Sequence, residues 1–263
     1  MPAREYQTIA LEQDGAVLTL WLDRPQVKNA FNSQLLKELC AALDKAAADP
    51  SVRVLVVSGR GDCFCAGADL EWMRAVVDFT FERNVADSQA IADVFQKLYS
   101  LPKPTIAAVN GAAIGGGMGF VGACDLVVAS QDAKFGLSEV RLGLVPACIG
   151  PYLLRRAGAG RLRRYFLTGE RFSAETALDL GLVDEVVPAA ELGAAVKRLA
   201  QALLAGKPQA QAKAKELLER VPAMSLSEAV PYTVEMIARL RAGPEAQKGM
   251  RDFLETRPVS RKP

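Results

Sequence analysis

The 263-residue chain contains no histidine. This excludes a histidine-based triad, a histidine general base and a histidine metal ligand, so proton transfer must fall to carboxylates, lysine, tyrosine or cysteine. Cysteine is scarce and odd in number, at five residues, and the pair Cys63 and Cys65 has the wrong spacing for a zinc knuckle. We therefore predict no metal centre. Apolar runs all fall short of the roughly 18 residues that a membrane span needs.

Charge of either sign is also not in excess, because 32 basic and 30 acidic residues leave a net charge of +2. That balance gives no reason to expect a nucleic-acid partner. An odd cysteine count without a secretory signal is typical of a reducing compartment, so we predict a cytoplasmic protein. Half of the residues are hydrophobic, which is enough to bury the core of one large domain.

Short apolar runs alternate with segments of helical spacing along the first two thirds of the chain. An alternation of this kind predicts an α/β fold with a parallel sheet. From Glu191 onward the pattern is helical only, so we divide the chain into a core, residues 1–190, and a C-terminal helical region, residues 191–263. The predicted strands are 17–22, 54–57, 105–109, 126–129 and 183–187, and the predicted helices of the core include 33–46, 84–100 and 116–123.

A run of glycines at 115–119 is the most informative feature that is present, and Glu139 follows it one predicted strand later. Backbone amides aimed at one point can stabilise a developing oxyanion, and a nearby carboxylate can move a proton. This pairing suits chemistry next to a thioester carbonyl. The apolar neighbours of Glu139 favour burial, which would raise its pKa. The alternatives are close helix packing for the glycines and an ordinary surface position for the carboxylate.

Three further motifs have competing interpretations. Residues 65–70 form a second turn of small residues, in which Asp69 is expected to cap the next helix. Residues 117–122 match the G-x-G-x-x-G dinucleotide fingerprint, but a helix of about two turns is too short for the crossover that this site requires. Five arginines between 155 and 164 indicate a solvated helix face or a subunit contact, with phosphate or RNA binding as the alternative.

The sequence resembles the crotonase superfamily, which is the enoyl-CoA hydratase/isomerase family, nearly from end to end. The segments that carry the resemblance are 24–32, 64–70, 103–107, 115–125 and 135–146. The resemblance implies a crotonase-like ββα spiral with a C-terminal helical trimerisation region, assembled as a homotrimer or a dimer of trimers. It also implies an acyl-CoA thioester substrate and no cofactor beyond the coenzyme A that forms part of that substrate.

Residue by residue, the resemblance implies an oxyanion hole at the amides of Ala66 and Gly116, and catalysis by Glu139. It implies further contacts with coenzyme A or the acyl chain for Lys28, Ala30, Ala68, Asp69, Leu70, Gly119, Phe253 and Arg257.

Position 119 departs from the two-glutamate hydratases, which carry a catalytic glutamate where this chain has glycine. Glu139 is then the only carboxylate at a catalytic position of the family. Segments 137–152 and 164–172 resemble bacterial methylglutaconyl-CoA and isohexenylglutaconyl-CoA hydratase-like proteins, so we predict an enoyl-CoA hydratase, with a C3-branched or glutaconyl-type substrate in the space left by Gly119. The alternatives are a single-glutamate enoyl-CoA isomerase and a non-catalytic CoA- or RNA-binding protein.

Overall fold

The structure is a computed structural model that describes residues 5–256. The chain divides into two compact units, the first ending at Leu203 and the second beginning at Leu204. Within the described residues no helix is long and apolar enough to cross a membrane.

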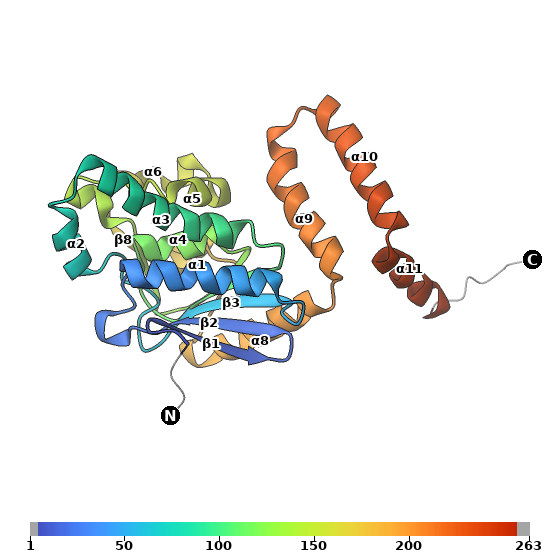
Figure 1. Cartoon of the computed structure of the whole chain (residues 1–263), viewed down its shortest axis with the longest axis horizontal. Helices are drawn as coiled ribbons and strands as arrows, with labels where there is room; N and C mark the ends of the chain where they lie inside the picture. The colour runs from blue at the N-terminus through green and yellow to red at the C-terminus, as the bar shows by residue number, and fades with distance from the viewer. Residues whose placement is uncertain (1–4, 257–263) are drawn as a thin grey trace, which may run out of the picture. The chain divides into compact units, whose positions relative to one another are not determined.

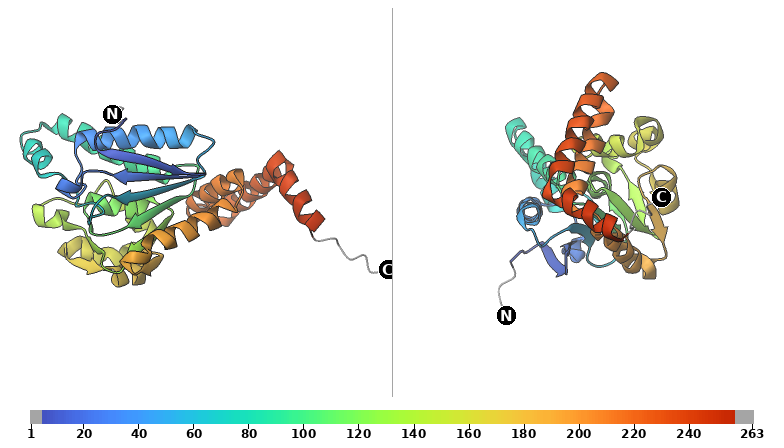
Figure 2. Two further views of the ribbon diagram at one scale, coloured as in Figure 1. Left: turned by 90° about the horizontal axis from the view of Figure 1, so that it is seen from below. Right: turned by 90° about the vertical axis from the view of Figure 1, so that its right-hand side faces the viewer.

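A mixed sheet of six strands forms the centre of the first unit, in the order β1-β2-β3-β4-β6-β9. Its strands are β1 (Ile9–Asp14), β2 (Val17–Leu22), β3 (Val54–Gly59), β4 (Thr105–Val109), β6 (Leu126–Ser130) and β9 (Glu185–Val187). All neighbours from β2 to β9 run parallel, which confirms the predicted parallel sheet. Strand β1, which the sequence did not predict, pairs antiparallel with β2 at the edge. Figure 2 shows these strands from two further sides.

A second, smaller sheet joins β5 (Ala113–Ile114), β7 (Lys134–Gly136) and β8 (Arg171–Ser173). Strand β4 of the large sheet leads into β5 of the small sheet and then into a helix, and β6 leads into β7 and then into a helical turn. In these two turns the chain therefore gives one strand to each sheet before it becomes helical. This is the ββα spiral that the sequence predicted.

Helices cover the large sheet, and α1 and α3 pack against each other (Figure 1). Asn32 caps α1, because its side chain accepts a hydrogen bond from the Leu35 amide at 2.9 Å. The helices of the first unit are α1 (Ser33–Ala48), α2 (Leu70–Val76), α3 (Phe81–Tyr99), α4 (Gly116–Ala123), α5 (Gly150–Ala157), α6 (Ala159–Thr168), α7 (Ala174–Asp179) and α8 (Leu192–Leu204), with shorter turns η1 (Pro25–Val27), η2 (Ser138–Leu142) and η3 (Ala189–Glu191).

A cluster of buried phenylalanine rings lies where α3 and α4 meet the chain just before α1. Phe31 lies 5.7 Å from Phe120 and 6.1 Å from Phe95, measured between ring centroids. Phe64 packs edge-on against Phe120 at 5.9 Å. All four rings are at most 2% exposed, so this cluster holds the start of α4 in a fixed place.

The second unit is helical, as the sequence predicted, and contains α9 (Pro208–Arg220), η4 (Val221–Ala223), α10 (Leu226–Ala242) and α11 (Pro244–Thr256). Helix α10 begins with a capping box between Ser225 and Glu228. Its side chains include several exposed apolar residues, namely Leu226, Val230, Val234 and Ile237.

Candidate active site

Two chain segments run side by side in the same direction. One follows β3 and contains Cys65, and the other contains β5. The Cys65 amide donates to the Ala112 carbonyl at 2.9 Å, and the Ile114 amide donates to the Cys65 carbonyl at 2.9 Å. Further along, a Cβ atom placed on Gly115 would lie 3.8 Å from the Cα atom of Gly67. Because the segments are parallel, the amides that follow these glycines emerge at the same end.

The first of these amides belongs to Ala68. Phe31 and Ala68 form a parallel bridge, in which the Phe31 amide donates to the Gly67 carbonyl at 2.7 Å and the Phe31 carbonyl accepts from Asp69 at 2.8 Å. Both bonds flank Ala68, so its own N–H points away from Phe31. Ala68 is exposed, and its amide forms no backbone hydrogen bond among the described residues.

The second amide belongs to Gly116, the first residue of α4. The first amides of a helix have no partner within the helix, and that of Gly116 finds no backbone acceptor elsewhere in the described chain. A Cβ atom at this position would lie only 2.2 Å from Cε2 of Phe31, which explains why glycine is needed. Together, Ala68 and Gly116 offer two free N–H donors of the kind that hold an oxyanion.

The structure contradicts the predicted oxyanion donor at Ala66. The Ala66 amide donates to the Lys28 carbonyl at 3.0 Å, so its hydrogen is already used to hold the turn. The donor facing the site comes two residues later, at Ala68, while the prediction of Gly116 agrees with its free amide.

Glu139 lies beside these glycines in the helical turn η2. The Gly115 amide donates to the Gly136 carbonyl at 2.9 Å, which joins the two segments. A Cβ atom on Gly115 would lie 3.3 Å from Oε1 of Glu139. Oε2 is buried and has no hydrogen-bond partner among the described residues. Burial raises the pKa of this carboxyl above its ordinary value, which makes the carboxylate a stronger proton acceptor.

Comparison with known proteins shows the family to which this fold and site belong. Residues 12–262 match the enoyl-CoA hydratase/isomerase family. The chain belongs to that family. An enoyl-CoA hydratase from Shewanella pealeana has a structure with a TM-score of 0.93 and 37% identity, over 96% of this chain and 95% of that one. The 2,3-dehydroadipyl-CoA hydratase of Escherichia coli is 35% identical over 92% of this chain and 93% of its own length. The crotonyl-CoA hydratase of Syntrophomonas wolfei is 33% identical over 96% of both.

Gly119, at the variable catalytic position of the family, leaves no open space, contrary to our prediction. A Cβ atom there would lie 2.3 Å from Cζ of Phe95 and 2.7 Å from Cγ2 of Ile149. Gly119 is itself buried. The volume that a glutamate would need is already filled by these two side chains, so we withdraw Gly119 as a substrate contact.

We expect Gly119→Glu to destabilise the fold. The new side chain must displace Phe95 and bury a carboxylate, and overpacking alone costs about 1–3 kcal/mol of unfolding free energy. Urea denaturation measures the loss. Gly160→Glu is the matched control, because a Cβ atom on this exposed glycine meets no atom within 4 Å. Equal urea midpoints for wild type and Gly119→Glu would show that Phe95 can move aside at no cost in stability.

Other residues implied by the family resemblance divide into exposed and structural ones. Lys28 is exposed in a left-handed conformation at φ 53°, and Leu70 is 70% exposed. Asp69 caps α2 and forms a buried ion pair with Arg24 at 2.8 Å, so its carboxylate holds the loop in place. Ala30 is buried, and its carbonyl accepts from the Arg24 side chain at 2.5 Å. These contacts make Asp69 and Ala30 parts of the frame around the site.

The remaining predicted contacts lie in the C-terminal region. Phe253 is on α11 of the second unit and is 58% exposed. Arg257 lies outside the described residues.

The turn that carries the Ala68 amide also contains a buried thiol, that of Cys65. Cys65 is fully buried, and its Sγ contacts the Asn29 carbonyl oxygen at 3.2 Å. Burial raises the pKa of this thiol to about 12. It therefore remains protonated at neutral pH and packs as an apolar group.

Two of the five arginines between 155 and 164 are engaged in contacts within the chain. Arg156 donates to the Leu182 carbonyl at 2.9 Å and pairs with Asp184. Arg164 pairs with Glu170. These internal contacts argue against a continuous basic face for RNA.

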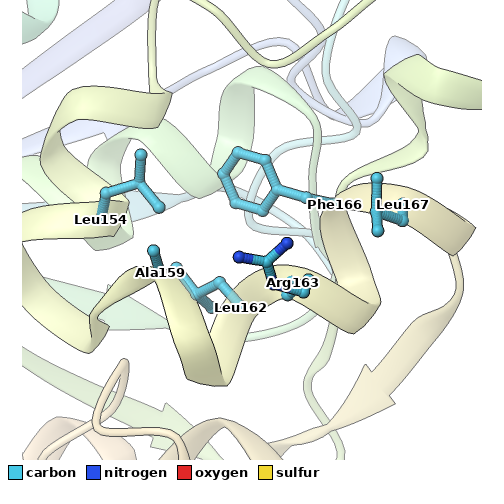
Figure 3. Close-up of a pocket in the computed structure, with 6 residues that line it drawn as sticks. All are labelled: Leu154, Ala159, Leu162, Arg163, Phe166 and Leu167. Carbon is cyan, nitrogen blue, oxygen red and sulfur yellow. The ribbon is translucent and has the colours of Figure 1, made fainter.

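A shallow hollow of about 160 Å³ lies between α5 and α6 (Figure 3). It is lined by Leu154, Ala159, Leu162, Arg163, Phe166 and Leu167. Because this lining has no carboxylate, the hollow offers no acid or base for catalysis.

Proposed function

We propose that the chain is an enoyl-CoA hydratase, which adds water across the 2,3 double bond of an acyl-CoA thioester. The observation that carries this proposal is the Glu139 carboxyl, whose buried Oε2 has no hydrogen-bond partner among the described residues, beside the Ala68 and Gly116 amides, which bond no backbone acceptor there. The names of its relatives in the family support the same activity.

In the proposed reaction, the thioester oxygen accepts hydrogen bonds from the Ala68 and Gly116 amides. These bonds withdraw electron density from the conjugated double bond and make C3 electrophilic. They strengthen as negative charge develops on the oxygen, so they stabilise the transition state more than the bound substrate.

Glu139 moves the protons in this scheme. Its carboxylate takes a proton from a water molecule while the water oxygen forms a bond to C3, and the electrons of the double bond move to the thioester oxygen. The resulting enolate then takes the same proton back from Glu139 at C2. The carboxylate is regenerated, and one water molecule has been added.

A single carboxylate also suits an enoyl-CoA isomerase, and the filled space beside Gly119 leaves no room there for a second one. In that reaction Glu139 would remove a proton from one carbon of the acyl chain and return it to another, without adding water. Mass spectrometry of a panel of CoA thioesters separates the two. We expect a product heavier by one water molecule, whereas a rearranged product of unchanged mass would establish the isomerase.

We propose a C3-branched or glutaconyl-type acyl chain on the resemblance of segments 137–152 and 164–172 alone. The space beside Gly119 is filled by Phe95 and Ile149 and gives this acyl chain no support. Relatives are named for acyl chains as different as crotonyl and dehydroadipyl. The panel should therefore contain crotonyl-CoA beside a branched glutaconyl-CoA.

We further propose that exposed Lys28 and Leu70, with Phe253 and Arg257, contact coenzyme A. Assembly as a homotrimer or dimer of trimers is proposed from the family resemblance and is supported by the exposed apolar side chains of α10. Light scattering in solution would count the subunits. The five free thiols agree with a reducing, cytoplasmic location.

A further inference from the structure

We propose that Phe31 is a positioning residue that sets the spacing between the two amides of the oxyanion hole. The inference rests on the proposed function, since it assigns a task to a residue beside that site. Phe31 follows the exposed Lys28 segment and is itself only 2% exposed. Its backbone contacts the turn that carries the Ala68 amide, and its ring contacts the start of α4.

The backbone contact fixes Ala68. The Phe31 amide donates to Gly67 and the Phe31 carbonyl accepts from Asp69, at 2.7 and 2.8 Å. These two bonds hold the residues on either side of Ala68. The direction of the Ala68 N–H therefore depends on where the backbone of Phe31 lies.

The ring contact fixes Gly116. The three atoms nearest to a Cβ placed on Gly116 all belong to the Phe31 ring, at 2.2, 2.6 and 3.4 Å. The ring thus lies directly against the Cα atom of Gly116. Phe95 and Phe120 pack on its other sides, so the ring has no room to move away. One buried residue thereby holds both donors at a set distance.

Spacing matters because an oxyanion donor acts over a narrow range, about 2.7–3.1 Å from the oxygen that it stabilises. A displacement of about 1 Å in a catalytic arrangement can cost on the order of 10²-fold in rate. Phe31→Leu keeps both backbone bonds but removes the ring from the Gly116 side. The Gly116 amide can then shift while Ala68 stays in place.

The test uses the full-length protein and 4-(dimethylamino)cinnamoyl-CoA, a coloured enoyl thioester whose absorption moves to the red when its carbonyl oxygen accepts hydrogen bonds. Wild type should give a red shift on binding, and Phe31→Leu a clearly smaller one. We also expect kcat for a turned-over thioester to fall about 10–100-fold, with KM within about threefold. Phe172→Leu is the matched control, because this ring is also buried in the hydrophobic core but packs against Phe135 and Tyr165 instead of against Phe31.

Three results are decisive. A full red shift and normal kcat in folded Phe31→Leu would overturn the positioning role. Equal losses in Phe31→Leu and Phe172→Leu would reduce the effect to general core packing and overturn the positioning role as well. Absence of a red shift in wild type would instead contradict the oxyanion hole, and with it the proposed function.

A second variant approaches the same contact from the other side if Phe31→Leu fails to fold. Gly116→Ala places a methyl group against the Phe31 ring and should diminish both the red shift and kcat. Unchanged values in Gly116→Ala would contradict a fixed spacing between ring and amide.

Discussion

Replacement of Glu139 by glutamine should lower kcat by about 10²–10⁴, the usual contribution of a positioned acid or base. Glutamine preserves the shape of the side chain but cannot take a proton from water, and the chain has no histidine to replace it. Steady-state kinetics on the thioester found active in the panel measures the loss. Glu219→Gln, on an exposed face of α9, is the control and should retain wild-type kcat. A Glu139→Gln enzyme within threefold of wild type would remove Glu139 from the mechanism.

Misfolding can be separated from lost chemistry by the pH dependence of stability. Burial raises the folded-state pKa of Glu139 above its unfolded value. Its ionisation therefore reduces the unfolding free energy as pH rises through the interval between those two values, and the reduction persists at higher pH. Glutamine does not ionise, so Glu139→Gln should be at least as stable as wild type at neutral pH. An unstable variant would mean that the carboxyl has a structural partner.

Replacement of Ala68 by proline should lower kcat by about 10²–10³, as the loss of one oxyanion donor does. Proline removes the N–H itself, and within residues 5–256 Ala68 donates no backbone hydrogen bond that the fold would lose. Its side chain is exposed, so the ring has room. Gly116→Pro is a poorer choice, because its Cβ atom would overlap the Phe31 ring.

Ala68→Gly supplies the control for this experiment, since it removes the side chain but keeps the donor. We expect its kcat to stay close to that of wild type. Circular dichroism should confirm that both variants fold. If folded Ala68→Pro turned over normally, the thioester oxygen would have to be bound elsewhere.

Much of the fold was predictable because its long elements have clear periods. The apolar runs of β3 and β4 and the spacing of Leu35, Leu39 and Leu43 in α1 are strong local patterns. Strands β5, β7 and β8 have only two or three residues each, which is too short for any period to emerge. Their pairing depends on the tertiary contacts of the spiral.

The site was predictable to the level of its segments but not to the level of single atoms. The glycine run and the apolar setting of Glu139 pointed to the two segments of the site, and the family resemblance singled out Gly116 within the glycine run. Ala66 was wrong because the availability of an amide depends on the carbonyl opposite it, and Lys28 is distant in sequence. Gly119 was wrong for a similar reason, since a missing side chain gives free volume only if no neighbour fills it. Here the neighbour is Phe95, from another helix.

The protonated state of Cys65 has a consequence for an enzyme that handles activated alkenes. A 2-enoyl thioester is a Michael acceptor, and thiolates add to its C3 as readily as they attack other soft electrophiles. Cys65 lies in the same turn as Ala68, but with a pKa of about 12 it is almost entirely the neutral thiol at neutral pH, and the thiolate is the nucleophilic form. Burial of Cys65 therefore keeps the thiol nearest in sequence to the Ala68 amide from reacting with a 2-enoyl thioester.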